Sequence, residues 1–371
     1  MLNFKSTQIF LETLKCSIWG KVPNECLYKN LSIEDWEKIF ELSLNHTVDG
    51  HIASVILMLP EDRLPPKKIL LKWMVRLQRV EEQNYVFKKV ICQQAKIFEE
   101  NGVNAILMKG QAFANYYFNP KLRVNGDIDW FFPTKLDYLK ANELMDRLGK
   151  EFNIQNIDNC HYFFEGIKIE HHFKIIELTN PFVQSSINKI VEGLSENYSQ
   201  IDLFGQTVKI PNPMINILLV TTHILKHQVT FGIGLRQIVD SVMVYDKLIS
   251  KVDIKELNNN YKKLGILNWI RTYHNVMVEM LDFPISGIPS SSYNNKDTTW
   301  MREYILKTGN FGVISKNDEK LISQISRFNR FKIRIFNFRK FFPLAPFETF
   351  GYIYYFLRSK FKMKMNDFNL F

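Results

Sequence analysis

The hydrophobic periodicity of this chain changes twice, and these changes constrain its fold more than any other feature of the sequence. Apolar residues recur at helical spacing over residues 68–101. Two short apolar runs, 104–108 and 128–132, then have the length and the flanking turn residues of buried strands. Helical spacing returns over residues 214–281. The sequence therefore predicts an α+β fold, in which a mixed sheet of the α/β type is embedded between helical regions.

Turn signals divide the strand-rich part of the chain further. Glu165-Gly166 predicts a hairpin over residues 161–173, and Gly205-Gln206 predicts a second hairpin over 201–210. A helix is expected over 135–148. From these elements we expect four parts: an N-terminal helical region (1–84), an α/β domain (85–212), a helical domain (213–310) and a basic aromatic C-terminal segment (311–371).

Charge and cysteine content exclude several classes of protein. The net charge is +10, but the segment from Arg327 to Phe371 has ten lysines or arginines against Glu348 and Asp367, and so carries eight of these charges. The rest is close to neutral, so its charge does not indicate nucleic-acid binding. The four cysteines form no Cys-x-x-Cys pair, so a zinc ribbon is unsupported. Nothing suggests a disulfide framework, and there is no run of roughly 18 uncharged apolar residues, so we expect a cytoplasmic protein.

Two acidic residues, Asp127 and Asp129, lie two positions apart in a predicted strand. Side chains alternate along a strand, so both carboxylates point to the same face. Their like charges repel each other unless a cation lies between them, and hard oxygen ligands favour Mg²⁺ or Mn²⁺. Glu170, in a second predicted strand, is the candidate for a third carboxylate ligand. Such a set can bind two metal ions and the triphosphate of a nucleotide.

The order of motifs resembles a known family. A strand ending in Lys109-Gly110, then a helix, then Arg123-x-x-Gly126-Asp127-Ile-Asp129, is similar to the uncharacterised nucleotidyltransferase family of the DNA polymerase β superfamily. Later elements of the family are matched by an acid-x-His pair and by helical motifs: Glu170 and His172, His223 and His227, Gly234-Leu-Arg236 and Asp240. The resemblance covers roughly residues 85–250, and makes the predicted α/β domain nucleotidyltransferase-like.

This resemblance implies a role for each matching residue. Asp127, Asp129 and Glu170 are then the catalytic metal ligands, and His172 contacts these ligands without binding the metal itself. The nucleotide-binding residues are then Lys109, Gly110, Gln111, Arg123 and Gly126. Of these, Lys109 and Arg123 would neutralise phosphate charge, and Gly110 would let the backbone approach the phosphates. The chain departs from the superfamily at Gln111, where serine or glycine is usual.

The function that this resemblance implies is Mg²⁺- or Mn²⁺-dependent transfer of a nucleoside monophosphate from an NTP to an acceptor hydroxyl, with release of pyrophosphate. Two alternatives are open: a phosphotransferase on the same fold, and a catalytically weak nucleotide-binding or scaffold module. No long basic groove is expected near the acidic pair, so a small molecule or a protein is favoured over a polynucleotide as acceptor.

Two pairs at i, i+4 spacing have alternative interpretations. His223 and His227 share a helix face and could bind zinc or form a packed, hydrogen-bonded pair, and the lack of an obvious third ligand favours the packed pair. Arg236 and Asp240 could form an ion pair within their helix or contact the nucleotidyltransferase-like domain.

The basic aromatic C-terminal segment also has several interpretations. Its phenylalanines and tyrosines alternate with basic residues such as Arg339, Lys340, Arg358 and Lys360. This pattern suits helical packing or a protein partner, the surface of an anionic membrane, or stacking on nucleic acid. We favour packing or a protein partner first, peripheral membrane contact second and nucleic acid last.

Overall fold

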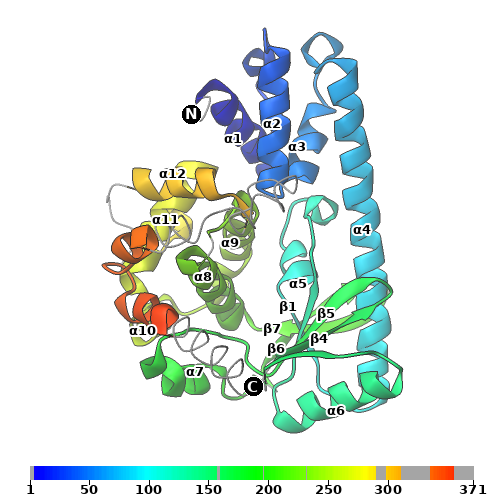
Figure 1. Cartoon of the computed structure of the whole chain (residues 1–371), viewed down its shortest axis with the longest axis vertical. Helices are drawn as coiled ribbons and strands as arrows, with labels where there is room; N and C mark the ends of the chain where they lie inside the picture. Colours follow the sequence, from blue (N-terminus) through cyan, green and yellow to red (C-terminus); the bar gives the residue numbers. More distant parts are fainter. Residues whose placement is uncertain are drawn as a thin grey trace, which may run out of the picture.

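The computed structural model describes residues 4–156, 159–194, 196–230, 232–289, 298–310 and 335–354. In Figure 1 the N-terminal helices lie at one end of the molecule and the sheet lies toward the other. The long helix α4 (Lys67–Glu100) runs along both of them. Helices α8 (Pro213–Thr230) and α9 (Leu235–Leu248) lie beside the sheet region, on the side away from α4, so the sheet region is flanked by helices as expected.

The N-terminal region consists of α1 (Phe4–Trp19), α2 (Ile33–Asn45) and α3 (Asp49–Ile56). Helix α2 begins with a capping box, in which the Ser32 hydroxyl accepts from the Asp35 amide and the Asp35 carboxylate accepts from the Ser32 amide. Helix α4 begins after Pro66 and ends before Gly102, whose φ of +60° lies in the left-handed region. Its bounds confirm the helix predicted over 68–101.

A five-stranded mixed sheet has the order β1-β2-β5-β4-β3. Its strands are β1 (Ile106–Met108), β2 (Ile128–Phe131), β3 (Asn153–Asn156), β4 (Asn159–Phe164) and β5 (Ile167–His172). The central pair β2–β5 is parallel and the other pairs are antiparallel, which confirms the predicted mixed sheet. Strands β6 (Tyr198–Leu203) and β7 (Gln206–Pro211) form a separate two-stranded sheet.

Both predicted hairpins are present, with two-residue turns. Glu165 and Gly166 link β4 to β5, and both have positive φ, +51° and +75°. Phe204 and Gly205 link β6 to β7 with φ of +55° and +81°, so this turn lies one residue earlier than the sequence predicted. The reason is that tight hairpin turns of this kind need positive φ at both central residues, and Gln206 already belongs to β7.

The remaining helices are α5 (Gly110–Ala114), α6 (Lys135–Arg147), α7 (Gln184–Val191), α10 (Ile254–Lys263), α11 (Leu267–Leu281) and α12 (Thr299–Thr308). Short 3₁₀ turns lie at Glu25–Tyr28, Glu61–Arg63, Pro120–Leu122, Pro181–Val183, Ile249–Lys251 and Ile285–Gly287. One apolar core joins these elements and includes side chains from Ile9 to Ala345. The division into four parts stays a prediction, and α4 runs continuously through residue 84. Within the described ranges, no helix has the length and apolarity needed to cross a bilayer.

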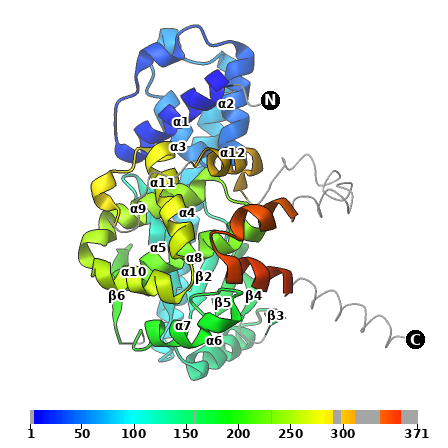
Figure 2. The same ribbon diagram turned by 90° about the vertical axis from the view of Figure 1, so that its left-hand side faces the viewer.

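The described part of the C-terminal segment forms helical turns over 335–341 and 346–354. Figure 2 shows these turns beside α8 and α12. The buried Glu348 carboxylate accepts from the backbone amides of Thr179 and Asn180 at 2.8 and 2.9 Å. Gly351 lies so close to Thr179 that a Cβ would meet its carbonyl oxygen at 2.3 Å. Through these contacts, this part of the segment packs against the chain around Thr179 and Asn180. The basic residues of this segment that come before residue 335 or after residue 354, Arg358 and Lys360 among them, lie outside the described residues.

Candidate active site

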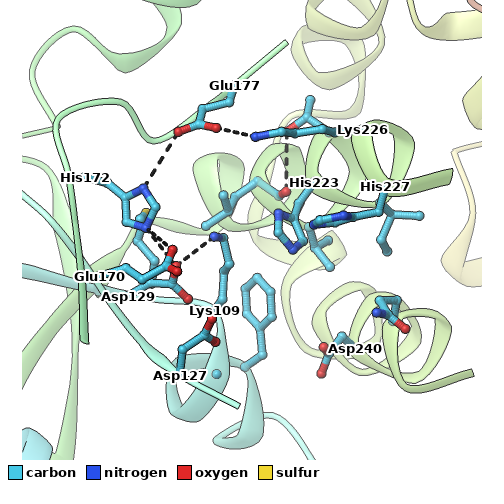
Figure 3. A pocket seen from close by; sticks show the side chains of 18 of the residues that line it. Lys109, Asp127, Asp129, Glu170, His172, Glu177, His223, Lys226, His227 and Asp240 are labelled. Atoms are coloured by element: carbon cyan, nitrogen blue, oxygen red, sulfur yellow. Dashed lines mark hydrogen bonds and ion pairs between the residues drawn. The ribbon is translucent and has the colours of Figure 1, made fainter. Parts of the chain in front are cut away.

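A cavity of about 310 Å³ lies between the sheet and helices α8 and α9, a volume at the low end of small-molecule sites. It is lined by every residue expected at the site except Gln111: Lys109, Gly110, Arg123, Gly126, Asp127, Asp129, Glu170 and His172. Figure 3 shows two facing sets of side chains. We refer to Lys109, Asp127, Asp129, Glu170 and His172 as the sheet wall, and to His223, Lys226, His227, Arg236 and Asp240 as the helical wall.

Strand register brings the acidic side chains of the sheet wall together. Asp129 in β2 lies opposite Glu170 in the parallel neighbour β5. Because side chains alternate, Asp127 extends the same face just before β2 begins. Ligand atoms of Asp129, Glu170 and His172 all lie within 4.8 Å of one another. Carboxylate oxygens in this cluster suit a hard divalent cation such as Mg²⁺ or Mn²⁺, and Asp127 lines the same cavity.

Three side-chain cations contact this cluster: Lys109, His172 and Lys168, which pairs with Glu170. Lys109 Nζ lies 3.0 Å from Asp129 Oδ1, and His172 Nε2 lies 2.9 Å from the same oxygen and 3.3 Å from Glu170 Oε2. Burial opposes ionisation of Asp129, but Lys109 and His172 outweigh it and hold the pKa of that carboxyl well below its usual range. Burial also opposes protonation of His172, but its hydrogen bonds to Asp129 and Glu170 raise its pKa to about 10. Asp129 and His172 are therefore both charged at neutral pH.

Asp127 lies in a different electrostatic environment. Burial, together with the negative charges of Asp129 and Glu170, raises its pKa to about 6. The attraction of Lys109 acts in the opposite direction but is weaker. A bound divalent cation would favour the ionised form of Asp127 and relieve this repulsion.

The turn from β1 into α5 has an unusual backbone that directs Lys109 toward β2. Lys109 has a φ of +49°, uncommon for a residue with a side chain, and Gly110 follows with +34°. A Cβ on Gly110 would lie 3.5 Å from the carbonyl oxygen of Asp127, an ordinary contact distance. The backbone conformation, rather than the available space, therefore requires glycine at this position.

Arg123 lines the cavity, but its guanidinium is engaged by the helical wall. Its Nε and Nη2 donate to the two carboxylate oxygens of Asp240 at 2.7 and 2.9 Å, and Nη1 donates to Asn125 Oδ1 at 2.6 Å. Burial opposes the charge of Arg123, but Asp240 more than compensates and raises its pKa. The sequence allowed Asp240 either an ion pair within its own helix or a contact with the predicted nucleotidyltransferase-like domain. The structure shows the second, because Asp240 pairs with Arg123. The role of Arg123 toward phosphate stays a prediction.

The two other expected nucleotide-binding residues differ in position. The buried Gln111 side chain is turned toward α4, where its amide donates to Asn84 Oδ1 at 2.6 Å. Gly126 lies at the cavity, and a Cβ there would have no neighbouring atom within 4 Å. Space alone therefore does not require glycine at position 126.

Sequence reasoning missed Glu177 and Lys226, which link the two walls. Glu177 Oε1 lies 3.7 Å from His172 Nδ1, and its other oxygen pairs with Lys226 of α8. Glu177 follows β5 in an irregular segment, so no periodicity marks it. Lys226 could have been found, because it shares a helix face with His223 three residues earlier.

His223 and His227 are in contact on α8, with ring centroids 4.4 Å apart. Burial lowers the pKa of His227 to about 3 and holds that of His223 well below its usual range, with nearby lysines adding to both shifts. Both rings are therefore neutral at physiological pH. Within the described residues, the close group of metal-ligating atoms is Asp129–Glu170–His172 and does not include this pair, which fits the packed alternative.

Comparison with known proteins places these features in a family. A family model described as uncharacterised nucleotidyltransferase matches residues 32–282, which is most of the chain. Among solved structures, the chain is similar to the crystal structure of an antigenic nucleotidyltransferase-like protein from Paracoccidioides brasiliensis. That likeness has 15% sequence identity, covers 52% of this chain and 92% of the other, and has a TM-score of 0.35. No curated protein matches the chain significantly.

Proposed function

The chain belongs to this family of uncharacterised nucleotidyltransferases, and from that membership we propose that it transfers a nucleoside monophosphate from an NTP to an acceptor hydroxyl. The observation that supports this most is the convergence of Asp129, Glu170 and His172 in one cavity, with Asp127 and Lys109 beside them. The proposed acceptor is a small molecule or a protein, because the cavity has the volume of a small-molecule site. The proposed location is the cytoplasm.

Asp127, Asp129 and Glu170 are the residues that would bind Mg²⁺ or Mn²⁺. When bound, such ions activate the attacking hydroxyl and stabilise the charge that develops on the phosphoryl group. Lys109 and His172 keep Asp129 ionised and fix the orientation of its carboxylate, so the ligand oxygens are preorganised. Glu177 in turn contacts the other ring nitrogen of His172.

In the proposed reaction, the acceptor oxygen forms a bond to the α-phosphorus of the NTP. The bond from that phosphorus to the bridging oxygen breaks, pyrophosphate leaves with the electron pair, and the hydroxyl proton passes to solvent. Gly110 allows close approach of the backbone to the phosphates, and Lys109 is positioned to neutralise their charge.

The test uses purified protein with Mg²⁺ or Mn²⁺ and each NTP labelled at the α-phosphate, with and without extract from the source cells. The wild type is compared with an Asp127→Asn/Asp129→Asn variant. We expect label in a new species with the wild type only, and a loss in the variant of at least about a thousandfold, because metal ions supply several kcal/mol of transition-state stabilisation.

A parallel reaction with label at the γ-phosphate separates the alternatives. Transfer of γ-label alone would identify a phosphotransferase and contradict the proposal. Transfer of neither label, with nucleotide still bound, would favour the nucleotide-binding module. Equal α-label transfer by the wild type and the double variant would mean that the reaction does not depend on Asp127 and Asp129.

A further inference from the structure

Arg236 of the helical wall is partly buried and has few of the contacts that a guanidinium removed from water needs. It lies in the first turn of α9 and lines the cavity. Its Nη1 donates to the backbone carbonyl of Val124 at 3.1 Å. Its Nε is buried and has no hydrogen-bond partner. A guanidinium offers five N–H donors in a planar fork, so donors remain available for a ligand.

Three other cations that line the cavity are paired with carboxylates. Lys109 is paired with Asp129, Lys226 with Glu177 and Arg123 with Asp240. In the part of the chain that the structure describes, Arg236 has no such ion pair. Burial, and the neighbouring charge of Arg123, lower its pKa, but a guanidinium remains protonated in proteins. An uncompensated charge that is partly removed from water is costly, and a bound anion would reduce this cost.

Arg236 is also positioned to contact a molecule that binds near Asp127 and Asp129. Its hydrogen bond to Val124 attaches α9 to the segment that continues into Gly126 and Asp127. Asp127 and Arg236 line the same cavity, and the negative charge of Asp127 opposes the fall in the pKa of Arg236. A molecule that binds a metal ion at the sheet wall and also contacts Arg236 would therefore carry several negative charges.

We propose that Arg236 forms an anion subsite of the cavity, which binds the polyphosphate chain of the nucleotide from the helical wall. The proposal deepens the proposed function and rests on it for the identity of the ligand as an NTP. In this proposal, Arg236 of the helical wall has the role in phosphate binding that the family resemblance implied for Arg123. A guanidinium recognises phosphate through two parallel N–H···O bonds, which a lysine in its place cannot form.

The experiment measures binding of inorganic tripolyphosphate by isothermal titration calorimetry in EDTA, so that no metal ion contributes. Arg236→Gln is expected to weaken binding at least about tenfold, because it removes a charged partner from a partly buried site. Arg236→Lys, which keeps the charge and serves if the first variant does not fold, is expected to weaken binding severalfold. Lys247→Gln, exposed near the end of the same helix, removes one charge and is expected to bind as the wild type does.

The outcomes separate this inference from the proposed function. The Asp127→Asn/Asp129→Asn variant is expected to bind tripolyphosphate at least as tightly as the wild type, although it cannot transfer label. Tripolyphosphate binding without NTP turnover would leave the subsite in place and contradict the proposed function. The subsite is contradicted if the wild type does not bind tripolyphosphate, or if both Arg236 variants bind it as the wild type does.

Discussion

The two walls of the cavity differ in how their residues are positioned. On the sheet wall, the register of β2 and β5 brings Asp129 beside Glu170. On the helical wall, Asp240 faces the cavity because α9 is attached to the loop after α5 through Arg123. Local strand geometry therefore builds the acidic half of the site, and tertiary packing builds the half that covers it.

The walls also differ in the charge of their imidazoles. His172 of the sheet wall lies between carboxylates and is protonated, whereas His223 and His227 of the helical wall are partly buried near lysines and are neutral. The two walls should therefore respond in opposite directions to a change of pH.

The largest effect is expected from breaking the ion pair between Arg123 and the helical wall. Asp240→Ala leaves Arg123 as a buried, unpaired cation, which should lower the free energy of unfolding by about 3–5 kcal/mol. Urea denaturation measures this loss. Asp246→Ala, in the same helix and more exposed to solvent, is the matched control. A loss of stability at Asp240 no larger than the control's would mean that this ion pair does not stabilise the packing of α9.

The sequence predicted the sheet wall better than the helical wall, because strand geometry is local and tertiary packing is not. Asp127, Asp129 and Glu170 follow from strand alternation and from short motifs that resemble the family. The Arg123–Asp240 contact joins residues 117 positions apart, and no local pattern encodes such a distance. Glu177 lies in an irregular segment, and the Glu348 contact with Thr179 spans 169 positions, so both were beyond prediction from periodicity.

A second prediction concerns the third carboxylate of the sheet wall. Glu170→Gln keeps the shape of the side chain but removes its charge, and should reduce nucleotidyl transfer about a hundredfold if the residue is a metal ligand. Glu165→Gln, in the turn of the same hairpin, should leave transfer unchanged. If the Glu170 variant transfers label at the wild-type rate, Glu170 is not a metal ligand.

A third prediction uses the raised pKa of His172. Its pKa is about 10 in the folded protein and about 6.5 in an unfolded chain, so its stabilising contribution is complete below pH 6.5 and is lost as the pH rises through 10. His172→Gln should therefore lower the free energy of unfolding by about 2–3 kcal/mol more at pH 6 than at pH 9. Urea denaturation in EDTA at the two pH values measures the difference, and an equal loss at both would contradict the protonated state.

A fourth prediction tests the opposite response of the helical wall. The pKa of His227 is about 3 when folded, so acidification below pH 6.5 adds a proton to the unfolded chain only and destabilises the folded protein. His227→Gln removes this term, and the variant should lose about 1 kcal/mol less than the wild type between pH 7 and pH 5.5. Thermal denaturation at both pH values checks the sign. A larger loss in the variant would contradict it.

The smallest effect is expected at the two glycines of the sheet side. Gly126→Ala places a methyl group where no atom lies within 4 Å, so stability should change by less than about 0.5 kcal/mol. Gly110→Ala should cost about 1 kcal/mol, because φ there is +34°. Equal effects in denaturation experiments would mean that backbone conformation does not distinguish the two positions.

The central claim is that the sheet wall binds a divalent cation through Asp127 and Asp129, and it can be tested without knowing the acceptor. The measurement is a titration of Mn²⁺ followed by electron paramagnetic resonance, for the wild type and for Asp127→Asn/Asp129→Asn. A Glu143→Gln/Asp146→Asn variant removes two exposed charges from α6 as the control. We expect the control to bind Mn²⁺ as the wild type does, and the Asp127/Asp129 variant to bind at least about tenfold more weakly. Equal Mn²⁺ affinity in all three proteins would contradict the claim.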